Sequence, residues 1–368
     1  MMQKYEHNFF AWLPGDFPEE ICVPLQNGAQ NLLAALNDLD VNGLNLSEYN
    51  KRYFSDYKRK LFYSIECGVY LLALGAQRAG KPFHHLTIMD HGAGLGMICL
   101  LARSSGVGKV VYSDVYDVSC IDAAQLASAL KLSADAYFCG QTDEVCKQSL
   151  DAGLVPDVVV SRNVVEHVYD LEDFFQQVAL LPAKHLHLVV ATTANPANPL
   201  VDVYTRRIQR IAEYKGTSGK WGKDRDAARP FRLIRADLIR ASFPNMDEPT
   251  VDGLVNATRG LWKEDVINVV REFLRTGVMP KPQAHPTNTC DPLTGNRTEH
   301  LMPAGDYLLL ARKVGWNGKV MSGFYNTRYL KTYLNPVARF VNRVIRLTGF
   351  RFPALAPFVV FAFTRSRN

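Results

Sequence analysis

Residues 86–102, LTIMDHGAGLGMICLLA, pass from an apolar strand through one acid and three glycines into an apolar helix. Asp90 ends the apolar run, and Gly92, Gly94 and Gly96 then remove every second Cβ where the chain has to turn. Glycine adopts left-handed backbone angles and lets a ligand approach the backbone, so this spacing predicts a loop that binds a cofactor. A tight turn between strand and helix in an unrelated α/β protein is the structural alternative.

The glycine spacing separates this loop from two common phosphate-binding motifs. A dinucleotide fingerprint, G-x-G-x-x-G/A, needs a small residue at its sixth position, where this chain has Met97. A P-loop contains Gly-Lys-Ser or Gly-Lys-Thr, which the stretch lacks. The remaining pattern is D-x-G-x-G-x-G, and Met97 counts against an NAD-dependent oxidoreductase.

Further strands follow at the spacing of an α/β protein. Residues 109–115, KVVYSDV, form a β-branched run with Asp114 near its end, about 20 residues beyond the glycine loop, where an acid can hydrogen-bond both ribose hydroxyls. Apolar runs at 157–160 and 185–193 predict two more strands, with a helix at 171–181 between them. Strands that alternate with helices predict a parallel sheet whose ligands bind at the carboxyl ends of the strands.

Together these motifs resemble those of the class I S-adenosylmethionine (SAM) dependent methyltransferases that modify small molecules. The resemblance rests on the glycine loop, on Asp114, and on residues 157–168, DVVVSRNVVEHV; it covers residues 80–200 and resumes near 305. It implies an α/β, Rossmann-like fold with a mostly parallel seven-stranded sheet and helices on both faces. The last strand would be antiparallel, and N-terminal helices and a largely helical cap insertion would complete the fold.

The resemblance also implies which residues hold the cofactor, S-adenosyl-L-methionine. The glycine loop would hold the methionine part, Asp114 the ribose, and the turn at 140–143, GQTD, the adenine. The family commonly has Gly-Asp in that turn, so either Gln141 or Asp143 is left to meet the adenine amine. The implied cofactor contacts are Asp90, Gly92, Ala93, Gly94, Gly96, Asp114, Val115, Gln141, Asp143, Arg162 and Asn163.

The chain is long enough for a core and an addition that binds the substrate, and four parts are expected. Residues 1–80 form an N-terminal helical segment that the resemblance places over the cofactor pocket, and residues 81–198 form the SAM-binding core. Residues 199–304 form a cap that binds the substrate, and 305–368 complete the core sheet. Aromatic residues crowd the first part; most are expected to pack in a helical layer, and one or two to line the substrate pocket. These aromatic residues are Tyr49, Tyr53, Phe54, Tyr57, Phe62 and Tyr63.

The expected cap shows helical periodicity at 199–214, 231–243 and 261–276. Its first half is locally basic, and two interpretations stay open. The basic residues form a solvated face with a flexible loop, or they attract an anionic acceptor with phosphate, uronate or carboxylate groups. They are Arg206, Arg207, Arg210, Lys215, Lys220, Lys223, Arg225, Arg229, Arg232 and Arg235.

The C-terminal part predicts a helix at 307–314, a strand at 318–325 and a last strand at 356–364. Between these two strands lies an amphipathic helix with one apolar and one basic face. Its apolar residues are Val337, Phe340, Val341 and Val344, opposite Arg339, Arg343 and Arg346. We expect the apolar face to pack on the sheet; a weak contact with an anionic membrane surface is the alternative.

Composition limits the classes of function. Seven cysteines, an odd number with no C-x-x-C spacing, argue against a zinc site and a disulfide framework and favour a reduced, cytoplasmic protein. Acids interrupt any signal-peptide core near the N-terminus, and the apolar run at 352–363 is shorter than the ~20 residues of a membrane span. A net charge of +6 without a nucleic-acid motif disfavours nucleic-acid partners. No group of His, Asp and Glu has metal-ligand spacing, so no metal is expected, and the oligomeric state stays open.

The expected reaction transfers the cofactor's methyl group to a hydroxyl of a small or glycan-linked acceptor. The protein has to align the acceptor and exclude water, and a general base that removes the hydroxyl proton adds typically ~10² to 10⁴-fold. His167 is the first candidate base and His300 the second, with His91 a further candidate; for His167, an orienting role is the structural alternative.

Other reactions stay open. Nucleobase amino methyltransferases resemble one another in an Asn/Asp-Pro-Pro-aromatic turn, and residues 162–164, Arg-Asn-Val, stand in its place here, which disfavours an amine acceptor. N- or C-methylation of a small metabolite and a noncatalytic SAM-binding module remain as alternatives.

Overall fold

The computed structural model describes residues 7–216, 229–282, 285, 287–348 and 352–366. Within these residues, one sheet holds seven strands in the order β3-β2-β1-β4-β5-β7-β6. The strands are β1 (Thr87–His91), β2 (Lys109–Asp114), β3 (Ala136–Cys139), β4 (Val158–Arg162), β5 (His185–Thr192), β6 (Asn317–Ser322) and β7 (Val359–Ser366).

The sheet is parallel except for its last strand. β1 pairs in parallel with β2 and with β4, so that Met89 lies beside Val111 on one side and Val159 on the other. β7 runs antiparallel between β5 and β6. The strand order therefore reverses direction at β1, and ligands of open α/β sheets bind beside such a point, at the carboxyl ends of the strands. The predicted fold class, with its antiparallel last strand, is confirmed.

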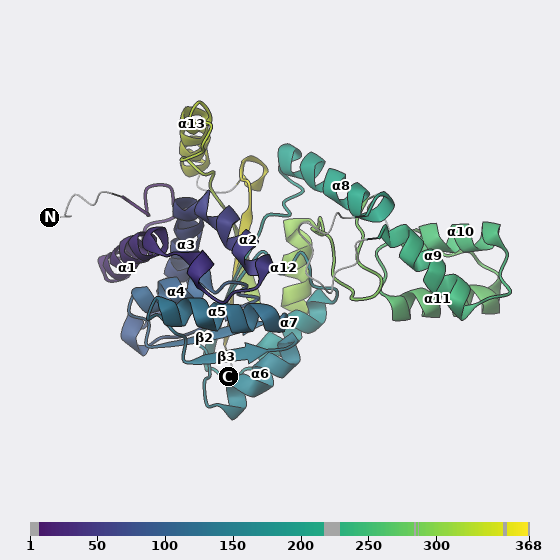
Figure 1. Ribbon diagram of the computed structural model, residues 1–368, viewed down its shortest axis with the longest axis horizontal. Helices are drawn as coiled ribbons and strands as arrows, with labels where there is room; N and C mark the ends of the chain where they lie inside the picture. Colours follow the sequence, from purple (N-terminus) through teal and green to yellow (C-terminus); the bar gives the residue numbers. More distant parts are fainter. Residues whose placement is uncertain (1–6, 217–228, 283–284, 286, 349–351, 367–368) are drawn as a thin grey trace. The chain divides into compact units, whose positions relative to one another are not determined.

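Helices cover both faces of this sheet. α3 and α4 pack beside each other and against the sheet, while α6, α7 and α12 are successive neighbours elsewhere on it (Figure 1). The helices of this compact unit are α1 (Glu19–Asp38), α2 (Glu48–Lys58), α3 (Leu61–Ala79), α4 (Met97–Ser104), α5 (Asp117–Ala129), α6 (Thr142–Asp151), α7 (Leu171–Leu180), α12 (Ala304–Lys313) and α13 (Leu334–Leu347). Its short 3-10 helices are η1 (Val41–Gly43), η2 (Phe83–His85) and η3 (Pro353–Leu355).

The N-terminal helices belong to the same compact unit as the sheet, which comprises Met1–Val165, Leu171–Thr192 and Ala304–Asn368. α3 lies close to β4, because a Cβ on Gly75 would be only 2.6 Å from Val158 Cγ1. Such a close approach between helix and strand needs glycine. The helices before the sheet are therefore part of its core.

The second compact unit comprises Glu166–Asp170 and Thr193–Pro303. Its helices are α8 (Pro199–Tyr214), α9 (Phe231–Ser242), α10 (Glu248–Ala257) and α11 (Lys263–Thr276). The last three share a small apolar core that includes Ile239, Leu254 and Val266. The sequence pattern predicted three of these helices and missed α10, since Pro249 and Gly253 break the apolar pattern; the side chain of Asp247 caps its first turn.

The prediction that Val337 and Phe340 pack on the sheet is wrong. These side chains of α13 are 59% and 66% exposed, whereas Asn342 and Ile345 are buried. Asn342 explains the rotation of the helix, because its Oδ1 accepts the Tyr325 N–H at 2.8 Å and its Nδ2 donates to the Tyr325 carbonyl at 2.9 Å. Among the helices that the structure describes, none has the length and apolar character needed to cross a membrane.

Candidate active site

The glycine loop follows the carboxyl end of β1 and leads into α4. Gly92, Gly94 and Gly96 have φ angles of 71°, 55° and 74°, in the left-handed region that residues with a Cβ avoid. A Cβ on Gly92 would also lie 2.3 Å from Val164 Cγ2, so the loop packs directly against the segment after β4. The three glycines that the sequence singled out are therefore required by the backbone.

Asp114 ends β2 and is joined to the glycine loop. Its Oδ2 accepts the Gly94 N–H at 2.9 Å and its Oδ1 accepts the Tyr116 N–H at 2.8 Å. The carbonyl of Ser113 accepts the N–H groups of Gly92 and Ala93, each at 2.9 Å. Asp114 and the glycine loop, predicted as separate motifs, are thus joined by hydrogen bonds. Val115, which directly follows Asp114, is 37% exposed.

Asp90 lies beneath the loop. It is buried, and the Cys99 thiol donates to its Oδ2 at 3.7 Å. Burial raises the pKa of Asp90 to about 7 because a desolvated carboxylate is disfavoured. Asp90 therefore supports the loop from within the core, and its contact with the cofactor stays a prediction.

Asp90 makes stability depend on pH. Because its folded-state pKa is raised, its stabilising contribution is complete at low pH and is lost as pH rises through about 7. We expect the melting temperature to fall between about pH 4 and about pH 7, the range between the unfolded and folded pKa values of Asp90, and to fall less in Asp90→Asn. The exposed Asp143→Asn variant is the control. A melting temperature with the same pH dependence in Asp90→Asn as in the unsubstituted protein would contradict the assignment.

The turn proposed for adenine starts α6. Gln141 is the N-cap residue of that helix, and its N–H donates to Glu144 Oε2 at 2.8 Å in a capping box. The side chains of Gln141 and Asp143 are both exposed. Gln141 therefore has a local structural role, and the choice between the two residues as adenine contact stays open.

Three tyrosines of α2 follow one another at helical spacing. The rings of Tyr49 and Tyr53 stack at 6.1 Å, and those of Tyr53 and Tyr57 meet edge to face at 5.1 Å. Tyr53 also comes close to the glycine loop, since its Cε1 lies 3.8 Å from where a Gly94 Cβ would be. In the sequence, the spacing of four residues between these tyrosines indicates that they share one face of the helix. It does not show whether that face lines a pocket or packs in the core.

Arg162 ends β4 and Asn163 directly follows it; their contact with the cofactor stays a prediction. The Arg162 guanidinium donates to the Ser64 carbonyl at 3.4 Å, which ties β4 to α3. Asn163 has a φ of 56°, and its N–H donates to the Ala191 carbonyl at 2.8 Å. A left-handed backbone angle on a residue other than glycine is uncommon and occurs often at functional sites.

His91 is held on both sides. Its Nδ1 lies 3.1 Å from the Ser113 hydroxyl and its Nε2 lies 3.2 Å from the Thr142 hydroxyl. Burial lowers the pKa of His91 to about 4. With both ring nitrogens engaged and the neutral form favoured, this side chain is poorly suited to remove a proton from an acceptor.

His167 lies in the second unit with one nitrogen fixed and the other near an acid. Its Nδ1 is 2.8 Å from the Arg297 carbonyl, and its Nε2 is 3.9 Å from Glu299 Oε1. A carbonyl oxygen can only accept, so Nδ1 carries the ring proton and Nε2 carries the lone pair. Glu299 is one of few residues other than glycine with a positive φ, 44°.

Glu166, His167 and Glu299 form a cluster whose ligand atoms all lie within 4.8 Å of one another. A carboxylate, an imidazole and a second carboxylate at this spacing can surround a divalent cation or share a proton. Glu299 is far from Glu166 and His167 in the sequence, so spacing could not reveal the cluster. Neither Arg297 nor Glu299 was singled out as a site residue.

His300 belongs to the same segment but has a different environment. Arg297 Nη1 donates to its Nδ1 at 3.4 Å, so the neutral ring carries its proton on Nε2. Burial and then the Arg297 charge lower the pKa of His300 to about 3. His300 is therefore a weaker candidate base than His167.

Acids neutralise much of the described basic cluster of the second unit. Arg235 is buried and forms an ion pair with Glu213, and Arg206 pairs with Asp202 at 2.7 Å. Arg229 and Arg232 pair with Asp237 and Asp252 at 2.8 Å and 3.2 Å. Arg207 and Arg210 are exposed on α8. The predicted basic cluster also includes three residues that lie outside the described part of the chain: Lys220, Lys223 and Arg225.

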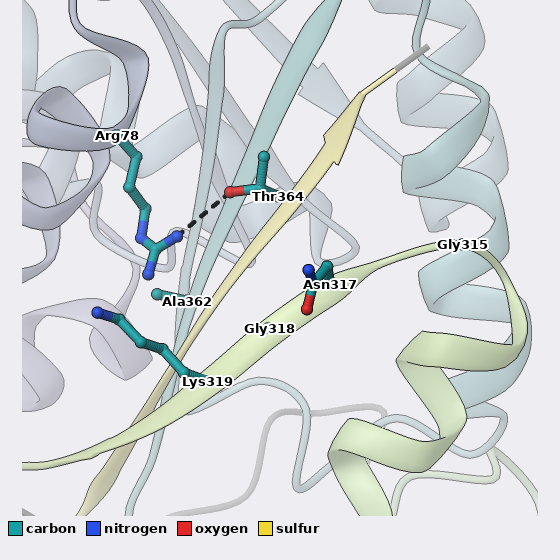
Figure 2. Close-up of a pocket in the computed structure, with 7 residues that line it drawn as sticks. All are labelled: Arg78, Gly315, Asn317, Gly318, Lys319, Ala362 and Thr364. Carbon is teal, nitrogen blue, oxygen red and sulfur yellow. Dashed lines mark hydrogen bonds between the residues drawn. The ribbon is translucent and has the colours of Figure 1, made fainter. Parts of the chain in front are cut away.

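A pocket of about 510 Å³ lies between β6, β7 and α3 (Figure 2). Arg78 Nη1 donates to Thr364 Oγ1 at 3.2 Å inside it. Thr364 lies beside His187 near the start of β5 and beside Asn317 at the start of β6. The pocket therefore lies at the amino ends of the parallel strands, whereas the glycine loop follows a carboxyl end.

No protein-family model matches this chain. A ubiquinone biosynthesis O-methyltransferase from Chelativorans sp. (strain BNC1) is 33% identical over 102 residues, which are 28% of this chain. The matched part spans 38% of the length of that curated relative.

Two solved structures are similar at low sequence identity. A SAM-dependent methyltransferase from Mesorhizobium loti has 16% identity and a TM-score of 0.36, covering 79% of this chain and 96% of that one. A SAM-dependent methyltransferase from Thermotoga maritima has 10% identity and a TM-score of 0.39, covering 86% of this chain and 98% of that one. The strand order, with β7 antiparallel between β5 and β6, gives this chain a class I SAM-dependent methyltransferase fold.

Proposed function

We propose that this chain binds SAM and transfers its methyl group to a hydroxyl of a small or glycan-linked acceptor. The observation that carries the proposal is the hydrogen bond of 2.9 Å between Asp114 Oδ2 and the Gly94 N–H. It joins a carboxylate suited to ribose hydroxyls with a glycine loop at the carboxyl ends of parallel strands, where ligands of such sheets bind. The match over 102 residues to an O-methyltransferase supports oxygen as the acceptor atom.

The residues present fit the cofactor. At Gly94, the Tyr53 ring is the one described group within 4 Å of a would-be Cβ, so the backbone is open toward a ligand there. Asp114 would hold the ribose hydroxyls, and the backbone at 92–96 would hold the methionine part. The sulfonium of bound SAM supplies an electrophilic methyl group.

We assign the proton acceptor to His167 Nε2. The bond from Nδ1 to the Arg297 carbonyl fixes the ring and leaves the Nε2 lone pair for the acceptor's hydroxyl proton. Glu299, with Oε1 at 3.9 Å, would stabilise the imidazolium that forms. Nδ1 would therefore orient the ring, and Nε2 would take the proton.

The acceptor is proposed to carry an apolar part and an anionic group. Leu200, Val203 and Tyr204 of α8 are 76%, 69% and 66% exposed, and Arg207 and Arg210 are exposed on the same helix. Exposed apolar and cationic side chains together favour an amphiphilic, negatively charged ligand.

Added salt is expected to weaken binding of the acceptor but not of SAM. Raising the ionic strength to a physiological level shortens the Debye length to ~8 Å, so KM for the acceptor should rise and KM for SAM should not. The double variant Arg207→Glu/Arg210→Glu should raise acceptor KM in the same way at low salt. Lys263→Glu/Arg271→Glu, two exposed residues of α11, is the matched control. Unchanged acceptor KM in both arms would leave a neutral acceptor as the better proposal.

The proposed activity is tested by mass spectrometry. The protein is incubated with SAM carrying a deuterated methyl group and with panels of hydroxylated metabolites, sugar nucleotides and lipid-linked glycans. The expected result is an acceptor whose mass rises by one labelled methyl group in place of a hydrogen, with equimolar S-adenosylhomocysteine. Label on nitrogen or carbon would overturn O-methylation, and SAM binding without transfer to any panel member would favour a noncatalytic module.

A further inference from the structure

The excess of positive over negative charge in this chain comes from its C-terminal part. Residues 307–368 contain 11 Lys and Arg and no Asp or Glu, whereas residues 1–306 contain 31 Lys and Arg against 36 Asp and Glu. The net charge of +6 therefore comes from the last sixth of the sequence. A segment of this kind attracts anionic partners over a Debye length.

α13 lies within this segment and exposes a row of large apolar side chains. Val337, Phe340 and Leu347 are 59%, 66% and 86% exposed and recur at intervals of three and seven residues, which places them on one side of a helix. Tyr333, just before the helix, is 68% exposed and lies four residues before Val337. The buried side, which carries Asn342, is a different one.

A row of arginines runs along the helix beside the exposed apolar row. Arg339, Arg343 and Arg346 are all exposed and are spaced by four and three residues. In the part of the chain that the structure describes, no ion pair involves any of them, and Arg346 donates to the Ala11 carbonyl at 3.0 Å. α13 thus has a packed side, a basic side and an exposed apolar side.

We propose that α13 lies in the plane of an anionic lipid surface, with its apolar row at the boundary of the acyl chains and its arginines against the headgroup phosphates. At 14 residues, the helix is ~21 Å long, a length that suits lying on the surface. A second copy of this chain would also cover the apolar row, but it would bring a second row of arginines with no acid in this segment to match it. Charge complementarity therefore favours the lipid surface.

The proposal is tested by flotation of the full chain with vesicles of phosphatidylcholine alone and with about one third phosphatidylglycerol, at low salt. The unsubstituted protein should float with the anionic vesicles only. Each arginine near such a surface changes partitioning about fivefold, so Arg339→Gln/Arg343→Gln should weaken it about 25-fold. Phe340→Ser/Leu347→Ser should weaken it at least about tenfold, because two large apolar side chains no longer leave water.

Leu180→Ser/Leu309→Ser, at sites 55% and 58% exposed on α7 and α12, is the matched control and should float like the unsubstituted protein. Circular dichroism checks that each variant is folded. Failure to float with anionic vesicles, or equal flotation of Phe340→Ser/Leu347→Ser, would overturn the proposal. A dimer by light scattering that this variant converts to a monomer, without vesicle binding by either form, would assign the apolar row to a second copy. None of these outcomes depends on methyl transfer.

Discussion

Replacing His167 with alanine is expected to lower kcat at least ~100-fold while leaving S-adenosylhomocysteine affinity near that of the unsubstituted protein. The reason is that Nε2, which faces Glu299 at 3.9 Å, is the proposed proton acceptor, whereas the cofactor contacts lie in the glycine loop and Asp114. Single-turnover kinetics with the acceptor found by mass spectrometry would separate the chemical step from binding. Equal losses of kcat and cofactor affinity would indicate an orienting role.

Two comparisons sharpen this test. His167→Asn keeps a donor near Nδ1 for the Arg297 carbonyl but has no Nε2. If Nε2 removes the acceptor's proton, this variant should be as slow as the alanine variant. Turnover near the unsubstituted level in His167→Asn would mean that the ring only orients the segment. Chelation with EDTA is expected to leave turnover unchanged. Loss on chelation that magnesium restores would assign Glu166, His167 and Glu299 to a metal site instead.

Asp114→Ala is expected to weaken S-adenosylhomocysteine binding by ~1 to 3 kcal/mol, about 5- to 150-fold, because a charge-assisted pair of hydrogen bonds to the ribose is lost. Isothermal titration calorimetry measures this directly. The same carboxylate also accepts the Gly94 and Tyr116 N–H groups, so the variant could lose affinity through the loop alone.

A cofactor analogue that lacks both ribose hydroxyls resolves these two causes. If Asp114 contacts the ribose, removing the hydroxyls weakens binding to the unsubstituted protein but has little further effect on Asp114→Ala. Independent, additive losses would limit Asp114 to shaping the loop. Val115→Ala, at the next residue, provides a control that keeps both backbone hydrogen bonds.

Local pattern was enough to predict six of the seven strands and the position of the glycine loop, whereas β3 (Ala136–Cys139) was implied only by the family resemblance. Closely spaced glycines, apolar strands and an acid at a strand end can each be recognised from a sequence pattern of a few residues. The link between Asp114 and Gly94 could be expected only through the family resemblance, since nothing in either segment specifies the other.

Features that depend on distant contacts were missed. The Arg297 carbonyl and the Glu299 carboxylate reach His167 from about 130 residues away in the sequence, so no spacing rule finds them. The face of α13 was misassigned for a related reason, because one polar residue, Asn342, pairs with the Tyr325 backbone and fixes the rotation against the larger apolar row. His91 follows a motif acid, yet its two hydrogen bonds, to Ser113 and Thr142, place it in the core.

The central claim, that the glycine loop and Asp114 form a SAM site, is tested most directly by calorimetric titration of the full chain with S-adenosylhomocysteine and with NAD. The account predicts saturable binding of one S-adenosylhomocysteine per chain, loss of that binding in Gly92→Val, where a side chain would meet Val164, and no heat of binding with NAD. Binding of NAD in place of S-adenosylhomocysteine, or unchanged S-adenosylhomocysteine affinity in a folded Gly92→Val variant, would contradict it.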